Sequence, residues 1–251
     1  EQTQMLIDNG YKEIVLTGVD LTSYGSDLPG QPSLGNMVGR LLKHVPDLKR
    51  LRLSSLDPVE IDADLLKLIG NEQRLMPHLH LSIQAGDDMI LKRMKRRHLR
   101  KHVIDLAKQL RDIRPGIVLG ADLIAGFPTE TDAMFKQSLN LISEIELVHL
   151  HVFPYSAREG TPAAKMPQVP QAMRKVRAAI LRKAGQNMLH QYLKSCVGRS
   201  ERVLVEKDSV GRTEHFIPMN VKISTGPGEI IEATVTSATM TELHGSYERQ
   251  S

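Results

Sequence analysis

The segments GIVLGADLIAGFP, residues 116–128, and DAMFKQSLNLISEI, residues 132–145, carry the pattern on which the fold class rests. The first is a short apolar run, which predicts a buried strand, and the second spaces its apolar residues by three and four, which predicts a helix. The same pairing recurs: strand-like segments are 12–20, 49–55, 78–86, 116–128 and 147–156, and helix-like segments are 34–45, 62–70, 99–113 and 132–145. Five strands that alternate with helices predict an α/β fold with a full or partial barrel.

Polar and glycine-containing residues follow these predicted strands. In an α/β barrel the functional groups lie at the carboxyl ends of the strands. In this chain the strand ends are Gly18–Asp20, Ser54–Ser55, Gln84–Gly86, Asp122–Gly126 and Pro154–Ser156. We therefore expect a functional site where these ends meet.

The first ten residues, EQTQMLIDNG, have the character of the last turns of a helix. Asn9 and Gly10 form a favourable C-terminal cap. A β/α barrel does not begin within such a crossover, so we expect a preceding strand and its loop to be missing. Residues 1–168 are thus predicted to form a partial barrel that is truncated at its N-terminus.

The pattern changes after Tyr155. Residues 161–171 contain three prolines and are typical of a linker. A long basic helix is predicted within residues 169–196, and its expected apolar face is Met173, Val176, Ile180 and Met188. The short β-branched runs of residues 197–245 predict a small all-β unit with the size of an OB-like barrel, a common oligonucleotide platform.

The charge of the chain is unevenly distributed. The formal net charge is only +4 and the pI is about 9.1, but the basic excess is concentrated in residues 92–101 and 174–194, which suits an anionic partner. The single cysteine, Cys196, excludes an internal disulfide and favours a cytoplasmic location. No run approaches the roughly 18 apolar residues of a membrane helix.

Five segments together resemble the radical S-adenosylmethionine methylthiotransferases of tRNA, in particular the group that modifies threonylcarbamoyladenosine beside the anticodon. They are EIVLTGVDLTSYG (13–25), LRLSSLDPVEI (51–61), HLHLSIQAGDDMILKRMKRRHLR (78–100), ADLIAGFPTETDAMF (121–135) and HVFPYSAREGTPAAKMP (151–167). The resemblance implies a radical-SAM-type (β/α) barrel followed by a TRAM domain that binds RNA. It also implies S-adenosylmethionine as cofactor, tRNA as substrate, and the addition of a methylthio group to carbon 2 of the modified adenosine.

The cysteine content departs from that family, whose members hold two 4Fe-4S clusters, each through three cysteines. With one cysteine, this chain is expected to hold neither cluster, to contribute no metal ligand and no catalytic residue, and to be inactive alone. It would then be a fragment or half of a split protein, with the missing N-terminal segment as a partner.

The resemblance implies a set of cofactor-binding residues: Gly18, Asp20, Ser55, Gln84, Arg96, Asp122, Gly126 and Tyr155. Asp20 would accept hydrogen bonds from the ammonium group of the cofactor, and Arg96 would bind its carboxylate. Gly126 would let the backbone approach the adenine closely. The segment Met94–His98 matches the family's Met-x-Arg-x-aromatic signature, with a histidine at the aromatic position.

Several of these residues could instead have a purely structural role. Turn formation is the alternative for Asp20, helix capping for Ser55, and core packing for Tyr155. Thr129 and Asp132 fit a capping box for the helix that follows.

Six basic residues are expected to contact RNA phosphates: Arg97, Arg100, Lys101, Arg174, Arg177 and Arg212. Each phosphate contact adds a salt-dependent attraction. The alternative for these residues is a solvated helix face. In the β-unit, aromatic stacking on bases would rest on Phe216, His215 and Tyr247.

Two other functions remain open on this reasoning. One is a non-catalytic RNA-binding protein that retains the barrel as a scaffold for the TRAM-like unit. The other is a phosphate-handling α/β-barrel enzyme, which ranks last because no glycine-rich phosphate loop is evident.

Overall fold

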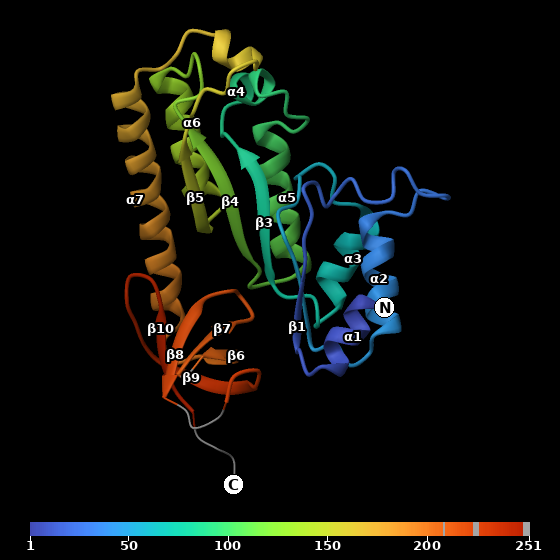
Figure 1. Ribbon diagram of the computed structural model, residues 1–251. Coiled ribbons are helices and arrows are strands. Elements are labelled where there is room, and N and C mark those ends of the chain that lie inside the picture. Colours follow the sequence, from blue (N-terminus) through green and yellow to red (C-terminus); the bar gives the residue numbers. More distant parts are fainter. Residues whose placement is uncertain (208, 223–225, 248–251) are drawn as a thin grey trace. The chain divides into compact units, whose positions relative to one another are not determined.

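The structure is a computed structural model that describes residues 1–207, 209–222 and 226–247 (Figure 1). Its contacts divide the chain into two compact units. The first comprises Glu1–Ser54, Asp62–His78 and Leu189–Ser251, and the second comprises Ser55–Ile61 and Leu79–Met188. The predicted barrel domain, residues 1–168, therefore contributes to both units.

The first unit contains a two-stranded parallel sheet with three helices. These elements are α1 (Gln2–Asp8), β1 (Glu13–Leu16), α2 (Leu34–His44), β2 (Arg50–Leu53) and α3 (Ala63–Asn71). Glu13 pairs with Arg50, and the register continues to Leu16 opposite Leu53. Gly10 follows α1 with φ of +90°, which glycine adopts without steric cost. The first two predicted strands and the helix that begins the chain are confirmed.

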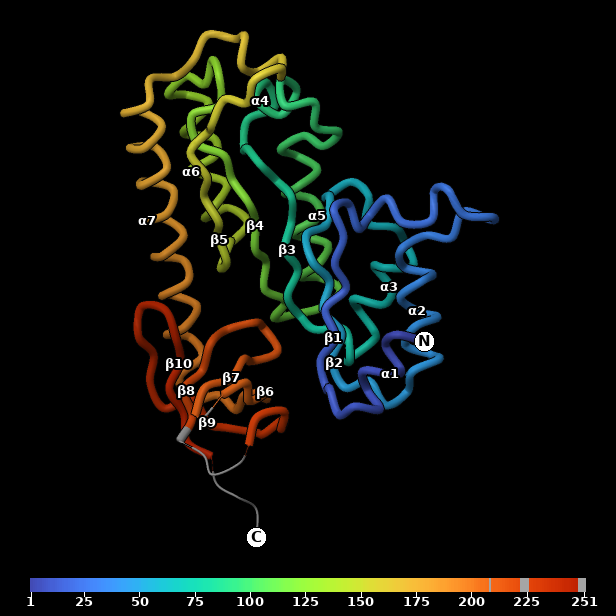
Figure 2. Tube along the Cα trace, in the orientation of Figure 1, coloured from blue at the N-terminus to red at the C-terminus, as the bar shows by residue number. Residues whose placement is uncertain are grey.

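The same unit contains a closed five-stranded barrel with the strand order β10-β8-β7-β6-β9 (Figure 2). Its strands are β6 (Ser200–Lys207), β7 (Val210–Thr213), β8 (Pro218–Lys222), β9 (Ile230–Ala238) and β10 (Leu243–Ser246). In β6, buried Val203 and Val205 alternate with more exposed neighbours, as a barrel wall requires. A small all-β unit is therefore present where the sequence predicted one.

Arg50 of β2 attaches the sheet of this unit to the barrel. Its side chain is fully buried and donates to the main-chain carbonyls of Arg202 at 2.7 Å and Arg212 at 3.3 Å. Burial lowers the pKa of Arg50, although the Glu13 carboxylate 3.6 Å away acts in the opposite direction. A buried guanidinium is tolerated only where acceptors of this kind replace water.

Arg52, two residues further along β2, makes the same kind of contact. It donates to the carbonyls of Thr213 and Glu214, both at 2.8 Å, and to the carboxylate of Glu13 at 2.7 Å. Its guanidinium carbon also lies 5.1 Å from the centre of the Phe216 ring. The planar, forked guanidinium suits such multiple contacts.

The second unit is built on the sheet β3-β4-β5 (Figure 1). Its elements are β3 (His78–Gln84), α4 (Asp88–Arg93), α5 (Arg100–Ile113), β4 (Val118–Ala125), α6 (Asp132–Glu144), β5 (Leu147–Pro154), the short 3-10 helix η1 (Pro162–Lys165) and α7 (Gln171–Cys196) as far as Met188. β4 and β5 run parallel, with Asp122 opposite His151. The last three predicted strands and the helices between them are confirmed.

Two local features of this unit differ from the expectation. The short helix α4 is absent from the predicted elements; Asp87 caps it by accepting from Met89 N and Ile90 N, both at 3.0 Å. The capping residue of α6 is Thr131, which accepts from Met134 N at 3.3 Å. The prediction that Thr129 caps this helix is wrong, because Thr129 lies in the preceding turn with φ of +68°.

The predicted facing of α7 is also wrong. Met173, Val176 and Ile180 are 41–56% exposed, whereas Ala178 and Leu181 are buried. The small residues of α7 face inward because they allow a close approach: a Cβ on Gly185 would lie 2.9 Å from Leu150 of β5. Within the described part of the chain, no helix combines the length and the apolar character that a membrane crossing requires.

Candidate functional site

One face of the β3-β4-β5 sheet is polar. Successive strand residues point to opposite faces, and β3 alternates accordingly. Its buried apolar residues are Leu79, Leu81 and Ile83, and its partly buried polar residues are His80, Ser82 and Gln84. Asp122 and His151 lie opposite each other in β4 and β5: Asp122 is partly buried between two buried residues, and His151 is exposed between partly buried Leu150 and buried Val152. The sheet thus buries one face and presents titratable groups on the other.

A pocket of about 480 Å³ opens where these strands end. Its lining residues are Gln84, Asp122, Ile124, Phe153, Pro154, Tyr155, Ser156, Arg158, Thr161 and Ala163. This volume lies within the roughly 300–1,000 Å³ of small-molecule sites. The structure therefore brings together three of the predicted cofactor residues, namely Gln84, Asp122 and Tyr155.

Two features of the pocket wall indicate a ligand site. Gln84 has φ of +70°, a conformation that non-glycine residues rarely adopt and that is often found at functional sites. The hydroxyl of Tyr155 is buried and has no hydrogen-bond partner among the described residues. A buried hydroxyl ordinarily has a partner, so a bound ligand is a natural candidate for it. The Tyr155 ring also packs edge-on against Phe127 at 5.2 Å, so its core role and its pocket role coexist.

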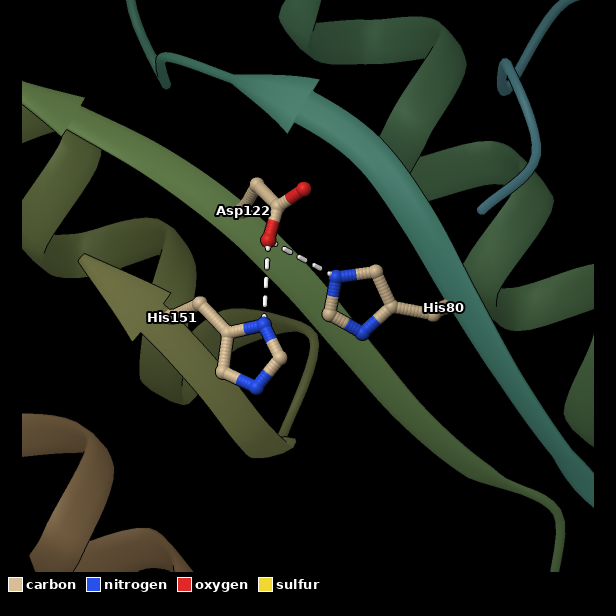
Figure 3. A group of neighbouring side chains, drawn as sticks. All are labelled: His80, Asp122 and His151. Atoms are coloured by element: carbon tan, nitrogen blue, oxygen red, sulfur yellow. Dashed lines mark hydrogen bonds and ion pairs between the residues drawn. The ribbon is translucent and has the colours of Figure 1, made fainter. Parts of the chain in front are cut away.

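His80, Asp122 and His151 form a cluster on the polar face (Figure 3). His80 Nε2 lies 3.0 Å and His151 Nδ1 lies 3.2 Å from the same oxygen, Asp122 Oδ1. The two imidazole rings are 4.9 Å apart between centres. The hydrogen bond with His80 lowers the pKa of Asp122, against the opposing effect of burial, so the carboxylate is ionised at neutral pH.

Gly126 at the end of β4 makes room for a side chain of α7. Its φ is +72°, and a Cβ there would lie 2.5 Å from Arg174 Cγ. Arg174 in turn donates to the carbonyls of Val169 at 2.7 Å and Tyr155 at 3.0 Å. Gly126 and Arg174 thus contact each other and have structural roles. The predicted contact of Gly126 with adenine and the predicted contact of Arg174 with RNA stay predictions.

Arg177 is an internal residue, and its assignment to RNA is corrected. Its side chain is 6% exposed and donates to Glu130 Oε2 at 2.8 Å, to the Glu130 carbonyl at 2.9 Å and to Asp132 Oδ1 at 2.6 Å. Glu130 also accepts from Gly126 N at 2.9 Å. Burial raises the pKa of Glu130, although Arg177 acts against the rise. Arg177 therefore balances a buried carboxylate and cannot reach a phosphate in this arrangement.

The residues that follow α4 divide into inward and outward positions. Arg96 lies 3.9 Å from Asp57 and is not among the residues that line the pocket. His98 is fully buried and donates from Nε2 to the Ile83 carbonyl at 2.9 Å, and burial lowers its pKa. The histidine of the signature is therefore a neutral core residue. Arg97, by contrast, is 64% exposed and pairs with Glu60.

Arg100 and Lys101 are adjacent but differ in their surroundings. Arg100 donates to the carbonyls of Gly86 at 3.1 Å and Gln137 at 2.9 Å and pairs with Glu144, so it fastens α5 to α6 and to the loop after β3. Lys101 is highly exposed and pairs only with Asp105 one turn away among the interactions that the structure describes. Of the two predicted RNA contacts, Lys101 is the accessible one.

Three further predicted cofactor residues, Gly18, Asp20 and Ser55, are not among the residues that line this pocket. Gly18, Asp20 and Ser55 are exposed. Asp20 accepts from Thr22 Oγ1 at 3.0 Å and Ser23 Oγ at 2.6 Å, which is the turn-forming alternative weighed for it. Their predicted cofactor roles remain predictions.

Arg212 and Phe216 of the barrel region contact each other. The Arg212 guanidinium lies 4.4 Å from the Phe216 ring centre, and Arg212 also pairs with Glu206 at 3.3 Å. The opposite neighbour of Phe216 is His78, stacked at 5.5 Å. Phe216 is thus engaged within its own unit, and the Arg212 side chain is about one-third exposed.

Sequence reasoning missed His80, His151 and Glu130. The signal for the histidines was present, because HLHLSIQ and HLHVFP each place a histidine on the polar side of an alternating strand. Their meeting with Asp122 depends on the order of three strands, which alternation within one strand does not specify. Glu130 had no local signal, since its partner Arg177 lies 47 residues away.

Residues 1–142 match the family described as the radical SAM superfamily. The chain is 55% identical to the threonylcarbamoyladenosine tRNA methylthiotransferase MtaB of Rickettsia prowazekii, over 92% of this chain and 55% of that protein. It is 35% identical to the tRNA-2-methylthio-N(6)-dimethylallyladenosine synthase of Rickettsia rickettsii, over 96% of this chain and 56% of that protein. The chain thus spans a little over half the length of these relatives.

Solved structures agree on the fold. The coproporphyrinogen III oxidase HemN of Escherichia coli matches with a TM-score of 0.52 at 20% identity, over 69% of this chain and 41% of that one. The radical S-adenosylmethionine methyltransferase TsrM of Kitasatospora setae matches with a TM-score of 0.51 at 14% identity, over 65% of this chain and 29% of that one. Since the family match covers more than half of the sequence and both structures share the fold, this chain belongs to the radical SAM superfamily.

Proposed function

We propose that this chain is the S-adenosylmethionine-binding and tRNA-binding part of a methylthiotransferase that acts on carbon 2 of threonylcarbamoyladenosine in tRNA. The observation that carries the proposal is the 55% identity to MtaB across 92% of the chain. The synthases that act on dimethylallyladenosine are 35% identical or less over a similar span. The difference favours the threonylcarbamoyl substrate.

The pocket on the polar face has groups that fit S-adenosylmethionine. The cofactor has a flat adenine, two ribose hydroxyls and a zwitterionic amino acid. Tyr155 offers a ring and an unpartnered hydroxyl, Gln84 offers an amide, and Asp122 offers an ionised carboxylate. When bound, the cofactor supplies the radical and the methyl group of the chemistry; the residues named here would orient it.

A 4Fe-4S cluster does not fit the donors of this chain. Such clusters are held by cysteine thiolates, and the only cysteine in the sequence, Cys196, is buried with its pKa raised by burial. We therefore propose that the 251 residues alone are inactive. The cluster ligands of a working enzyme would come from a further segment or a partner chain.

The RNA-binding part of the proposal rests on the terminal barrel and on exposed basic residues. A closed five-stranded barrel is a common oligonucleotide platform, and we propose that this one is a TRAM domain. Arg97, Lys101 and Arg212 are the predicted contacts that remain accessible. Substrate tRNA implies a cytoplasmic location and no need for a membrane.

The decisive experiment is nucleoside analysis by mass spectrometry of tRNA from cells in which the gene is inactivated. The expected result is loss of the 2-methylthio form of threonylcarbamoyladenosine and accumulation of the form without that group, reversed by the intact gene. Loss of the methylthio group from dimethylallyladenosine instead would refute the substrate. If neither nucleoside changed, the enzyme would be excluded in favour of a non-catalytic RNA-binding protein.

A further inference from the structure

Three side chains of types that can ligate a metal ion converge on the polar face of the second unit. His80, Asp122 and His151 come from β3, β4 and β5, which are neighbours in the sheet. Their ligand atoms all lie within 4.8 Å of one another. Figure 3 shows both imidazole rings turned toward the same oxygen of Asp122.

The spacing of these atoms suits a transition-metal ion. Zinc binds histidine nitrogen at about 2.0–2.1 Å and carboxylate oxygen at about 2.0–2.2 Å, so two ligands of a tetrahedral site are about 3.3–3.5 Å apart. The separations from Asp122 Oδ1 are 3.0 Å to His80 Nε2 and 3.2 Å to His151 Nδ1. The ligand atoms of the two histidines lie within 4.8 Å of each other, so one ion would also require the imidazoles to turn until these nitrogens reach the same tetrahedral spacing. Without an ion, the two hydrogen bonds to Asp122 hold the three side chains in this arrangement.

Two of the three potential ligand side chains are largely buried, and the third is accessible to solvent. The side chains of His80 and Asp122 are 12% and 24% exposed, and that of His151 is 65% exposed. Gly120 provides space for His80, since a Cβ there would lie 2.8 Å from His80 Nδ1. Asp122 also lines the pocket, so an ion held by its carboxylate would lie beside that cavity.

We propose that His80, Asp122 and His151 form a binding site for one divalent transition-metal ion, with a remaining coordination position directed toward the pocket. Two imidazoles and one carboxylate form a ligand set found in open zinc and iron(II) sites. The Irving–Williams order predicts that Co²⁺ binds more tightly than Mn²⁺, and Cu²⁺ more tightly than Zn²⁺. The open position would take a water molecule or an oxygen of a ligand in the pocket.

This site goes beyond the proposed function. It uses no cysteine, so it is chemically distinct from an iron–sulfur centre, and it differs from the expectation that the chain holds no metal ligand. Its test requires neither cofactor nor tRNA. A failed metal test would therefore leave the methylthiotransferase proposal standing, and the reverse also holds.

The experiment is a titration of the untagged 251-residue chain, stripped with a chelator, by isothermal calorimetry with Zn²⁺. The expected result is one saturable site per chain. The variants His151→Ala and Asp122→Asn should each weaken binding by at least about tenfold, since even indirect ligand partners contribute that much in metal sites. Visible absorption of the Co²⁺ form should disappear in the same variants.

The matched control is His44→Ala, which removes an exposed histidine at the end of α2 and should leave the affinity unchanged. His151→Ala is the informative variant if Asp122→Asn fails to fold, because the His151 side chain is largely exposed. The absence of a saturable site in the unmodified chain would overturn the proposal. Equal affinity in the unmodified chain and in His151→Ala would overturn it as well.

Discussion

The two parallel sheets of this chain use charged residues in different ways. In β2, Arg50 and Arg52 are almost completely buried, and carbonyl or carboxylate oxygens surround their guanidinium groups. On the β3-β4-β5 sheet, His80, Asp122 and His151 are partly open, and Asp122 lines a pocket. In β2 the two arginines are alternate residues of one strand, whereas the second cluster takes one residue from each of three strands. The two arginines are buried and already hydrogen-bonded, so their role is structural. The residues of the second cluster are more exposed, so they are available to a ligand.

The largest effect is expected where a buried charge is removed. Arg50→Met leaves two carbonyls without their donor and removes the cation that lies 3.6 Å from the Glu13 carboxylate, so the free energy of unfolding should fall by about 3–5 kcal/mol. Urea unfolding followed by circular dichroism would measure the change. The control is Lys12→Met, which breaks an exposed ion pair with Glu229 in the same unit and should cost less than about 1 kcal/mol. Equal costs would remove the distinction drawn between buried and exposed charge.

A smaller loss is expected for Arg177→Met in the second unit. The substitution leaves the buried carboxylate of Glu130 without its cation, but that carboxylate can take up a proton because burial already raises its pKa. We expect a loss of about 2–3 kcal/mol in urea unfolding. The double variant Arg177→Met/Glu130→Gln should recover part of the loss. If the double variant were less stable than the single one, the ion pair would not be the source of the effect.

The neutral histidine in the core should make stability depend on pH. Burial lowers the pKa of His98, so below its unfolded value near 6.5 the unfolded chain binds a proton that the folded chain does not. Its contribution to stability is therefore full above that pH and falls as the pH decreases, by up to about 1.4 kcal/mol per pH unit. His98→Gln should unfold with a shallower dependence between pH 7 and pH 5.5. An unchanged slope would show that folding does not lower the pKa of His98.

The smallest change in stability is expected at the exposed end of the basic run. Arg97→Met breaks a surface ion pair with Glu60 and should change the unfolding free energy by less than about 1 kcal/mol. If Arg97 contacts a phosphate, as proposed, the same variant should lower the salt dependence of tRNA binding by about one phosphate contact. Arg177→Met, measured under conditions in which the variant remains folded, should keep the full salt dependence of tRNA binding. Identical salt slopes for wild type and Arg97→Met would exclude the phosphate contact.

The strands and most helices could be predicted because periodicity is a local property of the sequence. Which side of a helix is buried was harder to predict from the sequence. In α7, Met173 and Val176 are exposed because Arg177 points inward to its ion-pair partner Glu130, which lies far away along the chain. The same limitation hid the histidine cluster, whose members lie 42 and 29 residues from Asp122. The resemblance named Gln84, Asp122 and Tyr155 as cofactor residues, and the structure places all three on one pocket, but the burial of Arg177 required coordinates.

The contacts that attach the terminal barrel to β2 tolerate amino-acid substitution in the barrel. Arg50 and Arg52 bind main-chain oxygens of residues 202 and 212–214, and every amino acid supplies such an oxygen. Replacement of the side chains at these positions leaves the acceptors in place as long as the backbone path is kept. The barrel surface can therefore change in sequence without loss of this anchor, and a grafted barrel with the same backbone path would find the same anchor.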